Sequence, residues 1–254
     1  MSHVPLLVPL TAETVACRTC YTDPSTFIGG KSVLGDWAPP RGWAGLPGTT
    51  TDLVVVSLNP GTALPGELFE YASHGLIPET HSTGVNSEQI IAVWAYGLRQ
   101  FRSPRRGQNW VFHRKAVALA HSLLCLLDGH YVEKDSLWSR VWFTDVFKCS
   151  TGRESGPSIS LPAERACRRH LERELSLLRP RLVVALGRRC SQALSRAGLP
   201  HVSFRHPSRG CSPWHADQHD KAFIAGASAL GCEVPIDFRN LCKRAHDEAF
   251  TVEA

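Results

Sequence analysis

The amino-acid sequence predicts an α/β fold, a three-layer sandwich built on a central four-stranded parallel sheet. Two observations carry this prediction. Four short apolar runs, rich in Val and Leu, are each closed by turn residues, as buried parallel strands are. Helical patterns lie between these runs, and strands that alternate with helices imply a parallel sheet covered on both faces.

In the first half of the chain, the strongest strand pattern is a continuous β-branched run at residues 52–58, ended by Asn59-Pro60-Gly61. An amphipathic helix is predicted around residues 88–101. Residues 115–127 read KAVALAHSLLCLL and predict a buried helix.

In the second half, a strand is predicted at residues 141–147 and a helix at residues 163–178, with prolines marking both ends of the helix. A third strand at residues 181–187 and a short helix that ends by Gly198 follow. A fourth strand runs into Phe204. This order completes the alternation of strands and helices on which the fold class depends.

The chain has 254 residues and 43% apolar content, which is enough for one sizeable core, so a single domain over residues 1–254 is expected. Gly and Pro gather in residues 1–50, which predicts a loop-rich entry segment, and a C-terminal tail is expected from about residue 240. No apolar run reaches the ~18 residues of a membrane span, and the start does not read as a signal peptide. A monomer in the cytoplasm, without a membrane partner, is expected.

The formal net charge is +5, and arginine outnumbers lysine. Arginine suits bidentate contact with phosphate, so the charge fits a nucleic-acid partner. An ordinary solvated surface explains the same excess, and charge alone does not decide between the two.

Three of the predicted strands end in polar residues, namely Asn59, Asp145 and His206. The carboxyl ends of parallel strands are where α/β proteins usually bind their ligands, so these side chains are expected to converge on one site. Each could instead cap a turn, because Asn-Pro-Gly and His-Pro-Ser are common turn sequences.

The chain has nine cysteines and no export signal, so a disulfide framework is a poor interpretation. Cys125, Cys190, Cys232 and Cys242 lie among apolar or helical neighbours and are expected to be inert. Cys17, Cys20, Cys149 and Cys167 require a separate explanation, which is metal ligation or four unrelated free thiols.

These segments resemble the uracil-DNA glycosylase superfamily. The first strand with Asn59-Pro60-Gly61 is similar to its first active-site motif, and His206-Pro207-Ser208 is similar to its second. The stretch from Trp142 to Leu194, which includes Thr144-Asp-Val-Phe-Lys-Cys149, is similar to the iron–sulfur (family 4) enzymes. The resemblance covers about residues 53–208 and the N-terminal cysteine pair.

The resemblance implies a structural [4Fe–4S] cluster held by Cys17, Cys20, Cys149 and Cys167, because family 4 enzymes carry four cysteines in this layout. Such a cluster would tie the N-terminal segment to the loop that follows Cys149. A zinc site on the same four thiolates is the chemical alternative.

The resemblance also implies roles in breaking an N-glycosidic bond, which places negative charge on the departing base. His206 is expected to donate a hydrogen bond to the base anion, and Asn59 is expected to position water. An amide is a poor proton acceptor, so Glu67 or Glu70 could assist. Backbone N–H groups in the segment from Leu58 to Gly61 are expected to hold the base or a phosphate; Pro60 belongs to this segment but has no N–H.

The target base must leave the DNA stack, and an aromatic side chain usually stacks on it. Phe112 is the first choice, with Phe69 second, and for each a place in the core is an equal alternative. Ser208 and Arg209 fall where the superfamily places its DNA-wedging loop.

Asp145 departs from the family 4 pattern, which usually has an Asn that reads N3–H and O4 of uracil together. An ionised carboxylate accepts from N3–H but cannot donate to O4, whereas a protonated one could donate. We therefore expect weaker or altered selectivity for uracil, toward an amino-bearing base such as adenine or cytosine, or hypoxanthine in a suitable pose.

The function expected from the resemblance is a DNA glycosylase of base excision repair, a hydrolase that flips out uracil or a related deaminated or damaged base and cleaves its N-glycosidic bond. The first alternative is a protein of the same fold that binds nucleic acid or a nucleotide without cleaving it. The second is a zinc-bound structural or interaction protein.

Overall fold

The structure is a computed structural model that describes residues 4–17, 43–45, 50–58, 69, 72–74, 86–102, 110–149, 161–207, 228, 240, 243–244 and 248. Within this part of the chain, no helix is both long and apolar enough to cross a membrane.

Four parallel strands form a single sheet in the order β2-β1-β3-β4. They are β1 (Leu53–Ser57), β2 (Val141–Asp145), β3 (Leu182–Leu186) and β4 (Val202–Phe204). The predicted α/β fold with a central four-stranded parallel sheet is therefore confirmed. Because every strand runs in the same direction, all four carboxyl ends lie along one edge.

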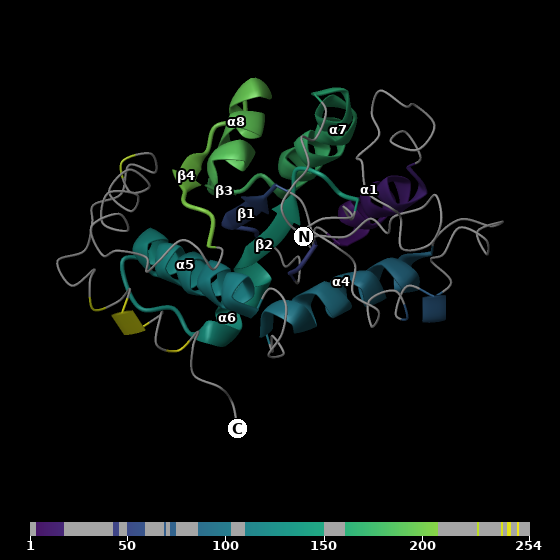
Figure 1. Cartoon of the computed structure of the whole chain (residues 1–254). Coiled ribbons are helices and arrows are strands. Elements are labelled where there is room, and N and C mark those ends of the chain that lie inside the picture. Colours follow the sequence, from purple (N-terminus) through teal and green to yellow (C-terminus); the bar gives the residue numbers. More distant parts are fainter. Residues whose placement is uncertain are drawn as a thin grey trace.

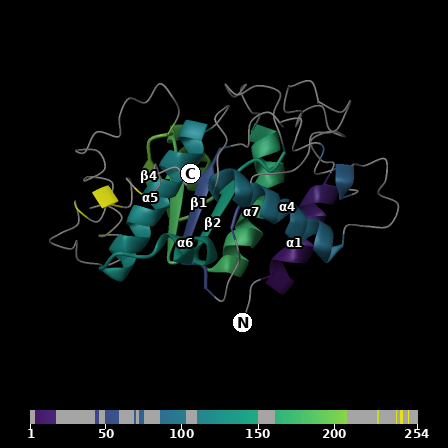
Figure 2. The ribbon, with the colours of Figure 1, turned by 90° about the horizontal axis from the view of Figure 1, so that it is seen from below.

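Helices cover both faces of this sheet. They are α1 (Val4–Ala16), α4 (Ser87–Arg102), α5 (Trp110–Asp128), α6 (Lys134–Arg140), α7 (Leu161–Leu178) and α8 (Arg188–Arg196). Figure 1 shows α7 and α8 on one side of the strands and α5 and α6 on the other. Seen from below, α5 lies in front of the strands (Figure 2). The three layers of the predicted sandwich are present.

Strand β1 shows why its sequence is continuously apolar. Leu53 and Val55 pack into one buried cluster, with α5 and α6, whereas Val54 and Val56 pack into a second cluster, with α1, α4, α7 and α8. Side chains alternate between the two faces of a strand, so a central strand covered on both sides needs apolar residues at every position.

Residues 4–16 form helix α1 within the N-terminal segment that was expected to be loop-rich. Pro9 lies inside this helix and removes one backbone donor, which is why the sequence reads as irregular. Burial of Leu7, Leu10 and Val15 against the fold stabilises the helix all the same.

A buried polar network joins β2 to α7. The Glu174 carboxylate accepts hydrogen bonds from the Trp142 indole, from the Thr144 hydroxyl at 3.0 Å and from the Lys148 ammonium at 2.5 Å. The side chains of Lys148 and Glu174 are 2% and 3% exposed, so the ion pair is almost completely shielded from water. Buried charges of this kind require close partners, and here each has them.

Candidate active site

The register of the sheet places Ser57 and Asp145 side by side at its carboxyl edge. They are partners in the parallel pairing of β1 with β2. Side chains two positions apart on a strand point to the same face, so Ser57 shares the face of Val55 and Asp145 shares the face of Phe143. Val55 and Phe143 pack in the cluster with α5, so Ser57 and Asp145 lie on the α5 face of the sheet. The sequence alternation alone identifies this face, although sequence analysis did not single out Ser57.

The carboxylate of Asp145 is held in place by its neighbours. The Ser57 hydroxyl donates a hydrogen bond to Oδ1 of Asp145, and Asp145 is only 4% exposed. Backbone pairing continues past both residues, because the N–H of Val146 donates to the Ser57 carbonyl at 2.9 Å and that of Phe147 donates to the Leu58 carbonyl at 3.0 Å. The carboxylate is thus held by a residue of the adjacent strand, within the hydrogen-bonded part of the sheet.

His206 and Phe112 lie together on the α5 face. Their ring centroids are 5.3 Å apart and their planes differ by 27°, so the rings stack. Phe112 comes from the first turn of α5 and packs against the cluster on that face. The two residues that were predicted to stabilise and to stack on the base are therefore neighbours.

The surroundings of His206 lower its pKa. The residue is exposed at the surface, but neighbouring protein removes enough water from the ring to disfavour the charged form, which moves the pKa below its ordinary value of 6.5. At neutral pH the imidazole is therefore mainly neutral, with one N–H that can donate.

Gly187, which directly follows β3, lies against His206. Its φ of +91° is a conformation that side-chain-bearing residues rarely adopt, and its N–H donates to the Phe204 carbonyl at 2.7 Å. A Cβ at this position would lie 3.0 Å from Cβ of His206. Glycine thus allows β4 and His206 to approach β3 closely, a role that sequence analysis missed.

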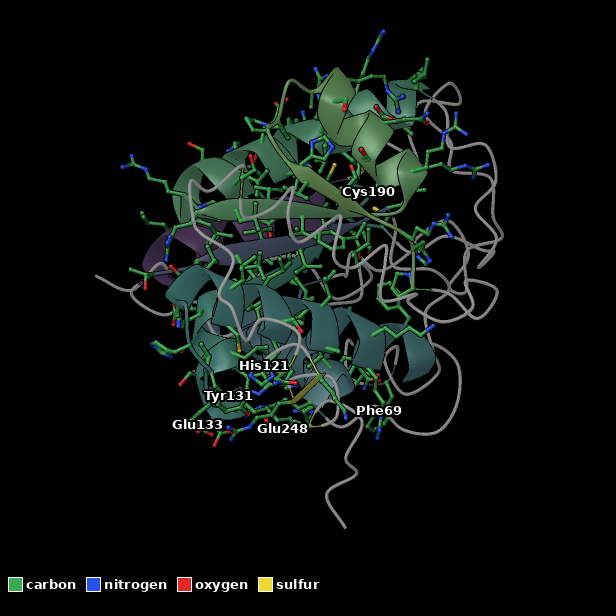
Figure 3. The ribbon with its side chains drawn as sticks, turned by 90° about the vertical axis from the view of Figure 1, so that its left-hand side faces the viewer. Phe69, His121, Tyr131, Glu133, Cys190 and Glu248 are labelled. Carbon is green, nitrogen blue, oxygen red and sulfur yellow. The ribbon has the colours of Figure 1, made fainter. Side chains whose placement is uncertain are left out.

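Cys190, at the start of α8, lies where the helix meets the sheet (Figure 3). Its thiol is fully buried and donates to the Val56 carbonyl at 3.2 Å. Burial raises its pKa, and the negative charge of Asp145 raises it further, so the thiol is neutral. Cys125 is also buried, as a cysteine among apolar neighbours was expected to be.

Other predicted residues are only partly placed. Leu58 follows β1, is partly buried and packs against the second cluster. Phe69, the second choice for stacking, is 74% exposed (Figure 3). The remaining predicted site residues lie outside the described residues; they are Asn59, Pro60, Gly61, Glu67, Glu70, Ser208 and Arg209.

Three of the four predicted ligand cysteines are described. Cys149 follows β2 and is 6% exposed, and Cys167 lies on α7 within the second apolar cluster and is 4% exposed. Cys17 lies at the end of α1, with Sγ 3.8 Å from the Arg169 guanidinium of α7. Cys20 is outside the described residues.

Helix α1 packs directly on the α7 face that carries Cys167. The Thr14 hydroxyl contacts Nδ1 of His170 at 3.2 Å, and Arg173 forms an ion pair with Glu13. Soft thiol donors on adjoining elements, two of them buried, fit an iron–sulfur or zinc centre chemically. Among the described residues alone, no three His, Cys, Asp or Glu side chains are grouped closely enough to hold a metal ion.

Comparison with known families gives one finding. The family model described as the uracil DNA glycosylase superfamily matches residues 46–226, well over half of the chain. The matched segment contains Ser57, Phe112, Asp145 and His206, together with Cys149 and Cys167. No curated protein matches the chain.

Proposed function

Because this chain belongs to the uracil DNA glycosylase superfamily, we propose that it is a DNA glycosylase, which flips a deaminated or damaged base out of DNA and hydrolyses its N-glycosidic bond. The observation that supports this most strongly is the stacking of His206 on Phe112, on the face of the sheet to which Asp145 also projects from the carboxyl end of β2. These three side chains offer an acceptor, a donor and a stacking surface for one base.

Glycosidic cleavage leaves negative charge on the departing base and positive charge on the sugar. A neutral His206 stabilises that anion by donating its N–H to a base carbonyl, and such donors act most strongly where water has been excluded. The lowered pKa of His206 keeps the imidazole neutral in the resting state, so its role is hydrogen-bond donation at the edge of the ring.

Phe112 is placed to stack on the same base. The N–H of His206 lies in the plane of the imidazole ring, so a base whose carbonyl accepts this hydrogen bond extends outward close to that plane. Because Phe112 lies nearly parallel to the imidazole, its ring would continue over the face of the base. Stacking of this kind stabilises a flipped base by about 1–3 kcal/mol.

Asn59 is proposed to position the attacking water, with Glu67 or Glu70 as the acceptor for its proton. Leu58, Pro60 and Gly61 are proposed to hold the base or a phosphate through backbone groups, and Ser208 and Arg209 to contact the DNA that the base leaves. These roles rest on the resemblance of the Asn-Pro-Gly and His-Pro-Ser motifs.

We also propose that Cys17, Cys20, Cys149 and Cys167 hold a [4Fe–4S] cluster. The support is the burial of Cys149 and Cys167 and the packing of α1, which bears Cys17, on α7. When bound, the cluster would supply covalent iron–thiolate cross-links between the N-terminal segment and the sheet. The residues of the α5 face carry the proposed base chemistry.

The test is a cleavage assay on oligonucleotides that carry uracil, hypoxanthine, xanthine or ethenocytosine, with protein purified anaerobically. We expect abasic product from at least one base, and His206→Ala should lower its rate by about 100-fold or more. His130→Ala alters an exposed histidine outside the site and should leave the rate unchanged. DNA binding without abasic product from any base would favour the alternative of a non-cleaving protein.

A further inference from the structure

The contact between Ser57 and Asp145 determines what Asp145 can offer to a base. The two residues are opposite each other in the β1–β2 register, and the Ser57 hydroxyl donates to Oδ1. Backbone hydrogen bonds from Val146 and Phe147 continue the strand pairing beyond this point. The hydroxyl and the carboxylate are therefore held together by the sheet itself and need no loop to order them.

A carboxylate that receives a hydroxyl proton is stabilised as an acceptor. Removal of that donor would weaken the stabilisation of the buried carboxylate, which favours the neutral carboxylic acid. The acid carries an O–H and can donate to a carbonyl, whereas the ionised form can only accept. The state of Asp145 thus decides whether the site favours an amino group or a carbonyl on the base.

The thiol of Cys190 lies near Asp145 and carries no charge. Cys190 is neutral and donates to the Val56 carbonyl, so it adds no second negative charge behind the carboxylate. Ser57 lies on the same face of the sheet as Asp145, whereas Cys190 packs in the cluster on the other face. Ser57 donates to Asp145 from within the proposed base site.

We propose that Ser57 is a specificity-determining positioning residue, whose hydroxyl holds Asp145 as a hydrogen-bond acceptor for a base that presents an exocyclic amino group. This inference rests on the proposed glycosylase function. It assigns the substrate to the amino-bearing class and assigns the selectivity to a pair of residues on adjacent strands.

The amino-bearing class is narrowed by the need to flip the base. Undamaged cytosine and adenine are paired and stacked, and the cost of extrusion is lowest for a damaged or mismatched base. A damaged pyrimidine that retains its amino group meets both requirements. 5-Hydroxycytosine is such a probe, and 5-hydroxyuracil differs from it by a carbonyl in place of the amino group.

The experiment measures kcat/KM for these two bases in the same single-stranded oligonucleotide, so that duplex unpairing does not contribute. The unsubstituted protein should favour 5-hydroxycytosine. Ser57→Ala should lower the ratio of the two kcat/KM values by about 10-fold, because loss of one hydrogen bond to a charged group is of that order. Ser57→Thr retains the hydroxyl and should keep the ratio within about threefold of the original.

Both bases are measured on one preparation, so a loss of folded protein cancels in the ratio. Asp145→Asn, which can donate from its amide, should turn the preference toward 5-hydroxyuracil. An unchanged ratio in Ser57→Ala would overturn the inference, as would preference of the unsubstituted protein for 5-hydroxyuracil or cleavage of other damaged bases but neither of this pair. Failure to release any base would overturn the proposed glycosylase function instead.

Discussion

At the scale of single residues, Gly187 controls the position of the group that would meet the base anion. Its backbone lies at φ +91°, and a Cβ added there would lie only 3.0 Å from Cβ of His206. Conformation and close approach therefore both require glycine here. Since His206 acts through a directional hydrogen bond, a small displacement of its ring should affect catalysis more than binding.

Gly187→Ala should lower the free energy of unfolding by about 1–3 kcal/mol, because alanine is strained at this backbone conformation. It should also lower the rate of base release at saturating DNA, because the added Cβ displaces His206. Urea denaturation and single-turnover cleavage measure the two effects separately.

Gly198→Ala is the matched control. Its φ is +68°, but a Cβ added there would have no atom of the described residues within 4 Å, so only backbone strain is introduced. It should cost about 1–2 kcal/mol of stability and leave the cleavage rate unchanged. Equal loss of activity in the two variants would mean that Gly187 does not position His206.

Individual residues also show how far the sequence predicts the site. Asp145 and His206 were expected to converge because they follow predicted strands, and the structure places both on the α5 face. Ser57 was missed because its importance depends on the register between β1 and β2, which joins residues 88 positions apart. Periodicity reveals the face of each strand but gives no register between distant strands.

At the scale of secondary-structure elements, the attachment of β2 to α7 depends on an ion pair shielded from water. Glu174 of α7 accepts from Lys148, just after β2, and from two side chains of β2 itself. This attachment also fixes the helix that bears Cys167. Loss of the carboxylate would leave the Lys148 ammonium buried without its counter-charge.

Glu174→Ala should lower the free energy of unfolding by about 3–5 kcal/mol, the usual cost of breaking a buried ion pair from one side. Replacing both partners with apolar residues, as in Lys148→Met with Glu174→Leu, should cost less. Urea denaturation of the three proteins tests this order.

The control is a solvent-exposed ion pair that joins the same helix, α7, to α1. Arg173 pairs with Glu13, and both side chains are about half exposed. Arg173→Ala should therefore change stability by no more than about 1 kcal/mol. Comparable losses in Arg173→Ala and Glu174→Ala would show that burial does not govern the strength of these pairs.

The elements differ in how readily they could be predicted. The four strands and helices α4, α5, α7 and α8 were expected, since each has a clear apolar pattern bounded by turn residues. Helices α1 and α6 were missed. Helix α1 contains Pro9, and α6 has only seven residues, so packing against the fold decides their conformation more than local sequence does.

At the scale of the whole molecule, described residues near both ends of the chain contact the central fold. Helix α1 packs on α4 and α7. Beyond the matched family region, the Arg244 guanidinium lies 3.5 Å from the ring centre of Tyr131, and the Tyr131 hydroxyl donates to Glu248. Figure 3 shows Tyr131 and Glu248 beside each other. Arg244 and Glu248, which belong to the predicted tail, thus contact the segment between α5 and α6.

The proposed cluster would strengthen the N-terminal attachment. Protein purified anaerobically should be brown, with broad absorbance near ~400 nm that reductant bleaches. Cys167→Ala should lose most of the bound iron and unfold at lower temperature, because the cross-link between α7 and the N-terminal segment is lost. Metal analysis and thermal denaturation provide the measurements.

Cys125→Ala is the control, since Cys125 is also buried but lies in the cluster with α5, among residues outside the proposed ligand set. It should retain the iron. Colourless protein that contains zinc would support the alternative zinc site. Protein that contains no metal, and whose stability is unchanged by Cys167→Ala, would show that these cysteines hold no metal.

The parallel pairing of β1 with β2 has a consequence for the order of folding. Ser57 meets Asp145 across 88 residues of chain, and every strand pair of the sheet is parallel and so needs a long connection. Contacts between residues so far apart form late, after most of the loop-closure entropy has been lost. The two halves of the base-reading pair should therefore meet only when the sheet is nearly complete, so that partly folded chains would have no means of selecting a base.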